Sequence, residues 1–246
     1  MGACRIQYVL LLSLLGFCPC SDTLNCQEGS VMKFGQNFSR TSIEWIVNQT
    51  VGSENNKGEM CQEIFLLIDV GEKSLILGTK GITTVPGKRK KTDVFSPGPG
   101  IVSASYVHFC DTDLCNNASS TKVLLDLLKL SGYNEPGTTK CPVCLDFKGS
   151  CDTESNHTLC PKDTKCYAAS LGVHGGDLSA IFSISGCLNS SHTYLLNNQN
   201  TIGIISIKET LESNVTLSSQ GLLVPSILLT WMFGLLALCL QRSVLC

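Results

Sequence analysis

The stretch that decides the fold runs from Cys141 to Cys187 and reads CPVCLDFKGSCDTESNHTLCPKDTKCYAASLGVHGGDLSAIFSISGC. It holds six cysteines within 47 residues, together with several glycines and prolines and few long apolar runs. Such a segment is too poor in apolar side chains to build a large core, so crosslinks must hold it together. The crosslinks are either disulfides or metal ions, and the cellular compartment decides between them.

The first residues indicate secretion. Arg5 precedes an apolar run from Tyr8 to Phe17, and Cys18-Pro19-Cys20 places small residues at the cleavage positions before Ser21. About ten apolar residues are too few to cross a bilayer. We therefore interpret residues 1–20 as a signal peptide.

A second apolar segment, Leu222 to Leu240, carries no charge and follows a polar spacer with small residues. This pattern is typical of a glycosylphosphatidylinositol (GPI) attachment signal. A spacer of about 8–12 residues puts the attachment at Ser213 or Asn214, with residues 215–246 as the propeptide. The alternative is a single-pass membrane helix, for which the one basic residue after the segment, Arg242, is a weak stop signal.

Both interpretations place the middle of the chain outside the cell. Six Asn-x-Ser/Thr sequons favour a glycoprotein, at Asn37, Asn48, Asn117, Asn156, Asn189 and Asn214. Without the signal peptide and the tail, an even number of cysteines remains, which is typical of a disulfide framework in an oxidising compartment. They are Cys26, Cys61, Cys110, Cys115, Cys141, Cys144, Cys151, Cys160, Cys166 and Cys187.

The mature chain reads as β-strands. Ile64–Val70 and Ser74–Thr79 flank a turn and predict a hairpin, and Ile101–Cys110 predicts a third strand after a Pro/Gly-rich loop. Further strands are predicted at Lys165–Leu171, Leu178–Cys187 and Thr201–Lys208.

The leucine-rich segment Val123–Leu130 predicts a short helix. We expect this helix to pack between two domains, and a contact with a membrane or a partner is the alternative.

No pattern indicates an enzyme or a cofactor site. Cys141 and Cys144 form a C-x-x-C, but the chain lacks the helix of a redox motif and the second C-x-x-C of a zinc ribbon. The histidines, which are scattered without metal-ligand spacing, are His108, His157, His174 and His192. A G-x-S-x-G motif is also missing. We therefore predict a protein that is not an enzyme, with no catalytic residue, no metal and no cofactor.

The charge of the chain does not suggest nucleic acid as a partner. The net charge is −2, and the pI is about 6.1. Four consecutive cations, Lys88 to Lys91, are interpreted as an exposed loop tip, with binding to sulfated glycans or an acidic surface as the alternative.

The sequence Cys110-Asp111-Thr112-Asp113-Leu114-Cys115-Asn116 resembles the C-x4-C-N ending of three-finger domains in the lymphocyte-antigen-6/urokinase-receptor family. The C-x2-C at Cys141 and Cys144 resembles the opening of a second such domain. The resemblance implies an all-β chain of two tandem disulfide-rich three-finger domains, residues 21–116 and 141–214, joined by a linker over 117–140. It also implies that the Asn116 side chain binds backbone at the base of the fingers.

The family pattern implies a set of disulfides that spacing alone could not choose. They are Cys26–Cys61, Cys110–Cys115, Cys141–Cys166, Cys144–Cys151 and Cys160–Cys187. The chain departs from the pattern at Ile82, where family members often have a cysteine, and the expected partner before Cys61 is also missing. We therefore expect the first domain, with its uncrosslinked Cys61–Cys110 span, to be the softer half.

The resemblance implies a GPI-anchored glycoprotein on the extracellular face of the plasma membrane, with shedding left open, that binds other membrane or extracellular proteins. Met1–Tyr8, Cys61-Gln62-Glu63 and Cys141–Cys144 resemble a two-domain family member of sperm cells, which implies male germ cells and a role in fertilisation. The alternative is a single-pass or GPI-anchored adhesion or ligand-binding receptor in another tissue.

Overall fold

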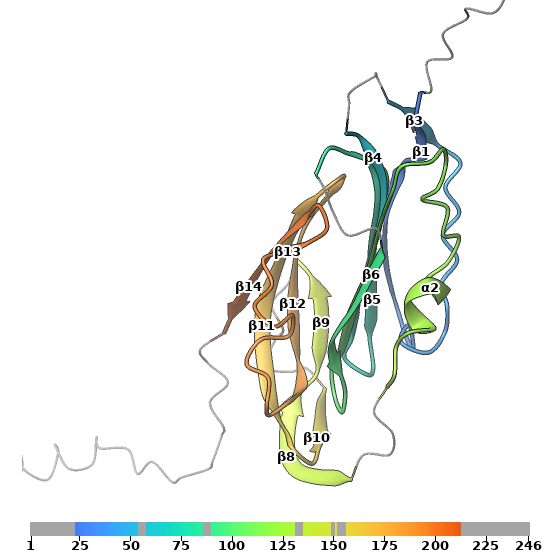
Figure 1. Cartoon of the computed structure of the whole chain (residues 1–246). Helices are drawn as coiled ribbons and strands as arrows, with labels where there is room; N and C mark the ends of the chain where they lie inside the picture. Colours follow the sequence, from blue (N-terminus) through green and yellow to red (C-terminus); the bar gives the residue numbers. More distant parts are fainter. Residues whose placement is uncertain are drawn as a thin grey trace, which may run out of the picture. The chain divides into compact units, whose positions relative to one another are not determined.

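The computed structural model describes residues 23–53, 58–85, 90–130, 135–148, 151 and 156–212, and nearly all regular structure in these ranges is β-strand (Figure 1). The predicted signal peptide and the predicted anchor, with Ser213 and Asn214, lie outside these ranges. None of the helices within the described ranges has the length and apolar character needed to cross a membrane. The predicted all-β fold class is confirmed.

The first sheet has five antiparallel strands in the order β2-β5-β4-β7-β6. Their bounds are β2 Gly29–Gly35, β4 Met60–Asp69, β5 Ser74–Thr83, β6 Lys90–Pro97 and β7 Val102–Cys110. The predicted hairpin is confirmed as β4 and β5, which pair Ile64 with Thr79 and Asp69 with Ser74. A separate two-stranded sheet joins β1, Asn25–Gln27, to β3, Thr50–Gly52.

Strand β6 lies inside the segment that the sequence predicts as a loop. The prolines of this segment suggested irregular backbone, but β6 is an edge strand that pairs only with β7. A proline at an edge removes no hydrogen bond from the ladder when its nitrogen faces outward. The loop prediction was therefore wrong for residues 90–97.

The second sheet has five antiparallel strands in the order β13-β14-β11-β12-β9. Their bounds are β9 Cys144–Phe147, β11 Thr164–Gly175, β12 Leu178–Asn189, β13 Thr201–Ile202 and β14 Ile205–Leu211. A separate pair joins β8, Pro136–Pro142, to β10, His157–Pro161. The predicted strand Thr201–Lys208 is instead the tight hairpin β13–β14, because Gly203 turns the chain with a φ of +57°.

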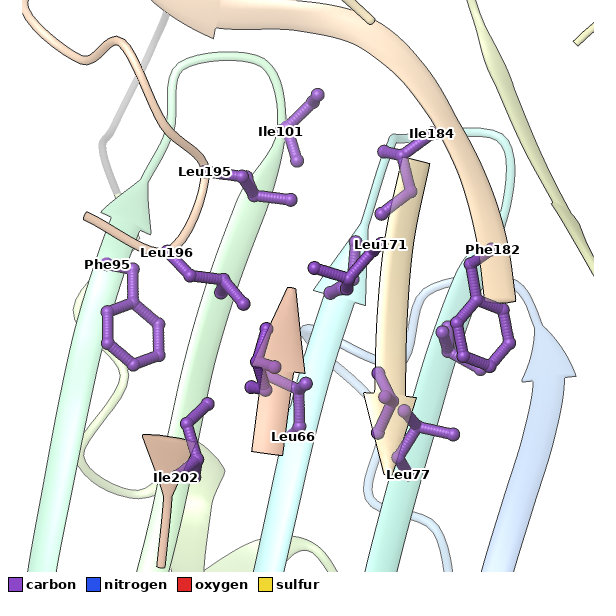
Figure 2. Close-up of a cluster of buried hydrophobic side chains, with 14 of the residues drawn as sticks. Leu66, Leu77, Phe95, Ile101, Leu171, Phe182, Ile184, Leu195, Leu196 and Ile202 are labelled. Carbon is purple, nitrogen blue, oxygen red and sulfur yellow. The ribbon is translucent and has the colours of Figure 1, made fainter. Parts of the chain in front are cut away.

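The two sheets bury one face each in a common apolar cluster (Figure 2). The first sheet contributes Leu66 and Leu77, and the second contributes Leu171, Phe182 and Ile184. All of these side chains are at most 1% exposed. A backbone hydrogen bond also joins the segment just before β7 to β12, since the Ile101 N–H donates to the Cys187 carbonyl at 2.7 Å.

The opposite face of the first sheet is also buried. Phe65 and Leu67 lie on this face and pack with Trp45, Phe38 and Leu124 in a second cluster. Leu124 belongs to the short helix α2, Lys122–Leu125. The prediction that this leucine-rich segment packs between two domains was therefore wrong, because its buried leucine covers the outer face of the first sheet.

The described residues contain five disulfides, which join the same pairs that the family resemblance implies. The two cysteines of the C-x-x-C do not bond to each other, since Cys141 pairs with Cys166 and Cys144 with Cys151. The sulfur atoms of Cys141, Cys160 and Cys187 lie within 4.8 Å of one another, but each is oxidised and offers no thiolate to a metal.

Candidate functional site

The first sheet contains a buried ion pair. Its acidic residue belongs to the Cys61-Gln62-Glu63 motif, which in the sequence indicates only a family resemblance. Glu63 in β4 pairs across the ladder with Lys80 in β5. The Lys80 Nζ atom is 3.7 Å from Glu63 Oε2, and the two side chains are 1% and 2% exposed. Charged residues in otherwise apolar strands were the signal in the sequence that could have identified this pair.

Both charges have additional partners. Lys80 Nζ donates to Gln27 Oε1 at 2.8 Å and to the Ala118 carbonyl at 2.7 Å, and it lies 5.0 Å from the centroid of the Trp45 ring. Glu63 accepts from the Ala118 N–H at 2.9 Å and from the Tyr106 hydroxyl at 3.1 Å. These contacts fasten the segment around Ala118 to the outer face of the sheet.

Burial governs the protonation of these groups. It lowers the pKa of Lys80 from its ordinary value, although the neighbouring Glu63 carboxylate acts in the opposite direction. Burial also raises the pKa of Tyr106 well above its usual range, and the charge and hydrogen bond of Glu63 add to this rise. The phenol therefore remains a hydrogen-bond donor to Glu63 at physiological pH.

Asn116 holds the base of the first sheet. Its side chain is fully buried, and its Nδ2 atom donates to the carbonyls of Gln27 at 2.8 Å and Gln62 at 3.0 Å. The Gln27 N–H donates back to Asn116 Oδ1 at 2.9 Å. The backbone-binding role that the family resemblance implies for this asparagine is confirmed.

A related polar contact stabilises the second sheet. The Tyr167 hydroxyl donates to Glu209 Oε1 at 2.5 Å, and the same carboxylate accepts from the N–H groups of Leu195 and Leu196 at 2.6 and 3.1 Å. Burial, with the charge and hydrogen bond of Glu209, raises the pKa of Tyr167 well above its usual range. This carboxylate therefore positions the turn that carries two leucines of the common core.

The outer face of the second sheet differs from that of the first. Within the described residues, no segment covers the half of this face near the β11–β12 turn, where Ile181 is 57% exposed. A groove of about 730 Å³ lies there. Its lining includes Lys148, Ser170, Gly172, His174, Ile181 and Lys208.

The strand register explains the shape of this groove. Leu171 and Val173 of β11 point into the core, so Ser170, Gly172 and His174 point outward. Gly172 pairs with Ile181 on one side and with Lys208 on the other. A residue without a side chain therefore lies between two larger ones, which leaves a trough along the central strand.

The groove cannot be read from the sequence, because its residues meet only through the pairing of three strands. His174 is one of the four histidines that are scattered through the sequence without metal-ligand spacing. The structure gives the histidines separate contacts, since His108 Nδ1 lies 3.2 Å from Glu63 Oε1 and His192 Nδ1 lies 3.0 Å from Asn197 Oδ1. His174 lines the groove.

The predicted cationic loop tip is partly a strand. Lys90 and Lys91 begin β6, and Lys88 and Arg89 lie outside the described residues. Lys91 forms an ion pair with Asp93 at 2.5 Å, and Lys90 Nζ lies 5.6 Å from the Tyr106 ring centroid. Two of the four cations therefore already have partners within the chain.

Five of the six predicted glycosylation sites are among the described residues, and none of these five lines the groove. Asn37, Asn48 and Asn117 are exposed in segments of the first half of the chain. Asn156 is exposed before β10, where its Nδ2 atom donates to Glu72 at 3.0 Å, and Asn189 ends β12. Asn189 lies eight residues from Ile181 along β12, about 27 Å in an extended strand. The sixth predicted site, Asn214, lies outside the described residues.

Comparison with known proteins identifies relatives that match most of the chain. Residues 137–218 match the u-PAR/Ly-6 domain family. The chain is 31% identical over 222 residues to Testis-expressed protein 101 of Mus musculus, covering 85% of this chain and 84% of that protein. It is 38% identical over 231 residues to CD177 antigen of Mus musculus, covering 89% of this chain but only 27% of the length of that protein.

A solved structure agrees with the fold. The crystal structure of mouse TEX101 superposes with a TM-score of 0.64 at 26% identity, over 76% of this chain and 97% of that one. A similarity that extends over nearly all of the solved chain shows that both halves share its architecture.

Proposed function

Because this chain belongs to the u-PAR/Ly-6 family, we propose that it is a non-enzymatic cell-surface glycoprotein that binds other membrane or extracellular proteins. The observation that carries the proposal is the outer face of the second sheet. This face has an open groove and an exposed isoleucine, whereas the same face of the first sheet is covered by Trp45 and Leu124. A single exposed isoleucine is ordinary on a protein surface, so the open groove beside it supports the proposal.

A photo-crosslinking amino acid tests this proposal on intact cells. Placed at Ile181, it should capture other surface proteins. Placed at Leu127, which is 53% exposed against 57% for Ile181, it should capture few, because Leu127 lies on the segment that covers the first sheet. Equal capture at both positions would remove the reason for assigning binding to the groove face.

The membrane attachment is a GPI anchor at Ser213 or Asn214 in this proposal. The apolar segment Leu222–Leu240 after a polar spacer supports it. Phosphatidylinositol-specific phospholipase C should release the anchored protein from intact cells into the medium. Retention, while the enzyme strips a known GPI-anchored protein from the same cells, would identify Leu222–Leu240 as a transmembrane helix.

The proposed tissue is the male germ line, with a role in fertilisation. Similarity to Testis-expressed protein 101 over 84% of that protein supports this part of the proposal. An adhesion or ligand-binding receptor in another tissue is the second candidate, since CD177 antigen, to which the chain is more nearly identical than to Testis-expressed protein 101, is not named for the testis. Antibody staining of testis sections and of other tissues separates the two, since staining absent from germ cells but present elsewhere selects the second.

A further inference from the structure

Gly172 gives the groove of the second sheet its depth, because it has no side chain to fill it. An added Cβ atom at Gly172 would meet only the carbonyl oxygen and Cβ of Lys208, at 3.7 and 3.8 Å, which are ordinary contacts. The backbone of Gly172 does not have the positive φ that requires glycine. Glycine weakens the interior of a strand. Neither packing nor backbone conformation therefore requires glycine here, and its effect is to keep the groove open.

Two lysines lie at the ends of a row of residues that crosses the strands on this face. Lys148, Ile181, Gly172 and Lys208 form one row, because the Lys148 N–H donates to the Ile181 carbonyl at 3.0 Å and Gly172 pairs with the other two. Three strand spacings separate the ends of this row, about 14 Å. An extended polypeptide covers that length in about four residues.

We infer that this groove binds an extended acidic segment of a partner protein, in which two carboxylates four residues apart flank an apolar residue. The carboxylates would meet Lys148 and Lys208, and the apolar side chain would lie on Gly172 against Ile181. Residues i, i+2 and i+4 of an extended chain face the same side, as this match requires. The inference rests on the proposed protein-binding function and names the chemistry of its partner.

A polypeptide fits the surface better than a sulfated glycan does. The row contains an isoleucine that is 57% exposed, which offers an apolar contact to a side chain. Asp146, which pairs with Ser183 in the neighbouring strand, and Asp177 in the β11–β12 turn are both exposed. These carboxylates would repel a uniformly charged polyanion, whereas a peptide can place neutral residues opposite them.

Cells that display the full chain provide the binding test. The probe is a biotinylated peptide with the core Glu-Ser-Leu-Ser-Glu, presented as a streptavidin tetramer so that weak contacts add. Peptides with Gln or Lys in place of both Glu residues, and a heparin-derived oligosaccharide, are presented in the same way. We expect only the Glu peptide to bind, and its binding to decrease as salt is raised.

Two variants should strongly reduce this binding without affecting the fold. Gly172→Val fills the groove with a residue that suits a strand, and Lys148→Glu with Lys208→Glu reverses both charges. We expect each to reduce tetramer binding at least about tenfold. Gly172→Ala, which adds a single methyl group, should reduce it less than the valine does.

Matched controls separate these effects from misfolding and from net charge. Lys73→Glu with Lys129→Glu makes the same change in net charge at exposed sites away from the groove. Gly81→Ala changes a strand glycine of the first sheet whose added Cβ would meet only Gln62 Nε2, at 3.8 Å. Both should bind the Glu tetramer like the wild type. Equal surface levels of all variants establish that each is folded and exported.

Three results would overturn the inference. The Glu tetramer could fail to bind the wild type, or it could bind Gly172→Val as well as the wild type. The heparin probe could bind instead and depend on Lys148 and Lys208, which would make the face a glycan site. If the crosslinker at Ile181 still captures surface proteins in such a case, the proposed function stands and only the acidic partner is refuted.

Discussion

Replacing Lys80 by methionine (Lys80→Met) tests the polar contacts that hold the segment around Ala118 on the first sheet. Methionine retains the length and the apolar stem of the side chain. It removes the charge 3.7 Å from Glu63 and the two hydrogen bonds to Gln27 and Ala118. The position is 1% exposed, so water cannot replace the lost donors.

The expected loss follows from these contacts. A buried acceptor left without a donor costs about 1–3 kcal/mol, and removal of one partner of a buried ion pair costs about 3–5 kcal/mol in total. We therefore expect Lys80→Met to lower the free energy of unfolding by about 3–5 kcal/mol. Glu63→Gln should lower it by a similar amount, because it leaves the Lys80 ammonium buried without a counter-charge.

The double variant decides whether the two charges act as a pair. Burial already disfavours the charged form of Lys80, as its lowered pKa indicates. Removal of both charges therefore leaves neither group unpaired in the interior. We expect the double variant Glu63→Gln/Lys80→Met to be more stable than the sum of the single losses predicts, by about 1–3 kcal/mol.

Trp45 provides the signal for this measurement. Its ring is 7% exposed and lies 5.2 Å from the Phe65 ring centroid, in the cluster that the segment covers. The full chain, solubilised in mild detergent with its disulfides intact, is unfolded in guanidinium chloride and followed by fluorescence. Trp231 is the other tryptophan of the chain, so Trp231→Phe serves as the background for all variants.

The control is Lys122→Met, which removes an exposed lysine paired with Asp126 on α2. It should change stability by less than about 0.5 kcal/mol. A loss below about 1 kcal/mol for Lys80→Met, or additive losses in the double variant, would refute the role of the ion pair. Apolar packing of Trp45 and Leu124 alone would then hold the segment.

Three further predictions test other parts of the structure. Asn116→Ala removes the three hydrogen bonds of a fully buried side chain and should lower the free energy of unfolding by about 3 kcal/mol, measured in the same denaturant series. Tyr106 and Tyr167 have raised pKa values in the folded chain, so their stabilising contribution is complete below about pH 10, the ordinary tyrosine pKa, and is lost progressively as the pH rises from there through the raised values. An absorbance titration at about 295 nm should accordingly show both phenols ionising only when the folded chain unfolds in alkali, and their titration near pH 10 in the folded chain would contradict the hydrogen-bond assignments. Alkylation of the denatured, unreduced chain should label none of the ten cysteines between Cys26 and Cys187, and a labelled peptide from this region would disprove at least one disulfide.

The alternation of polar and apolar residues along a strand also predicts whether one or both of its faces are buried. The run from Ile64 to Val70 has no regular polar alternation, and in the structure Leu66 packs against the second sheet while Phe65 packs against Trp45. An antiparallel strand with one solvated face alternates instead. Residues 170–173, Ser-Leu-Gly-Val, do alternate, and this part of β11 has only one face in the core. The contrast between the two patterns predicts which sheet is covered twice.

Neither the packing partner of α2 nor the groove could be predicted in this way. Leu124 buries itself against Phe65 and Trp45, which lie far away in the sequence. The groove needs Gly172, Ile181 and Lys208 in one row, and this row depends on the exact register set by the turns. A shift by one residue would move Ile181 into the core face and replace the groove with different side chains.

The missing disulfide does not by itself make the first predicted domain the softer half. A disulfide contributes about 2–4 kcal/mol, and burial of a large apolar side chain contributes about 1.5–3 kcal/mol. In β4, Phe65, Leu66 and Leu67 are all fully buried. The softer-half expectation therefore does not follow from the crosslink count alone, and hydrogen exchange of β4 against β11 would decide it.

Mutations on the outer faces of the two sheets should therefore have different effects. In the first sheet the outer face is sealed by Trp45, Leu124 and the buried Glu63–Lys80 pair, so changes there should act on stability. In the second sheet the outer face carries a glycine that neither packing nor backbone conformation requires. Because Gly172→Val is compatible with the strand, it should leave stability unchanged or raise it while removing binding. A variant that becomes more stable and loses its partner is the result expected when a residue is kept for recognition and not for folding.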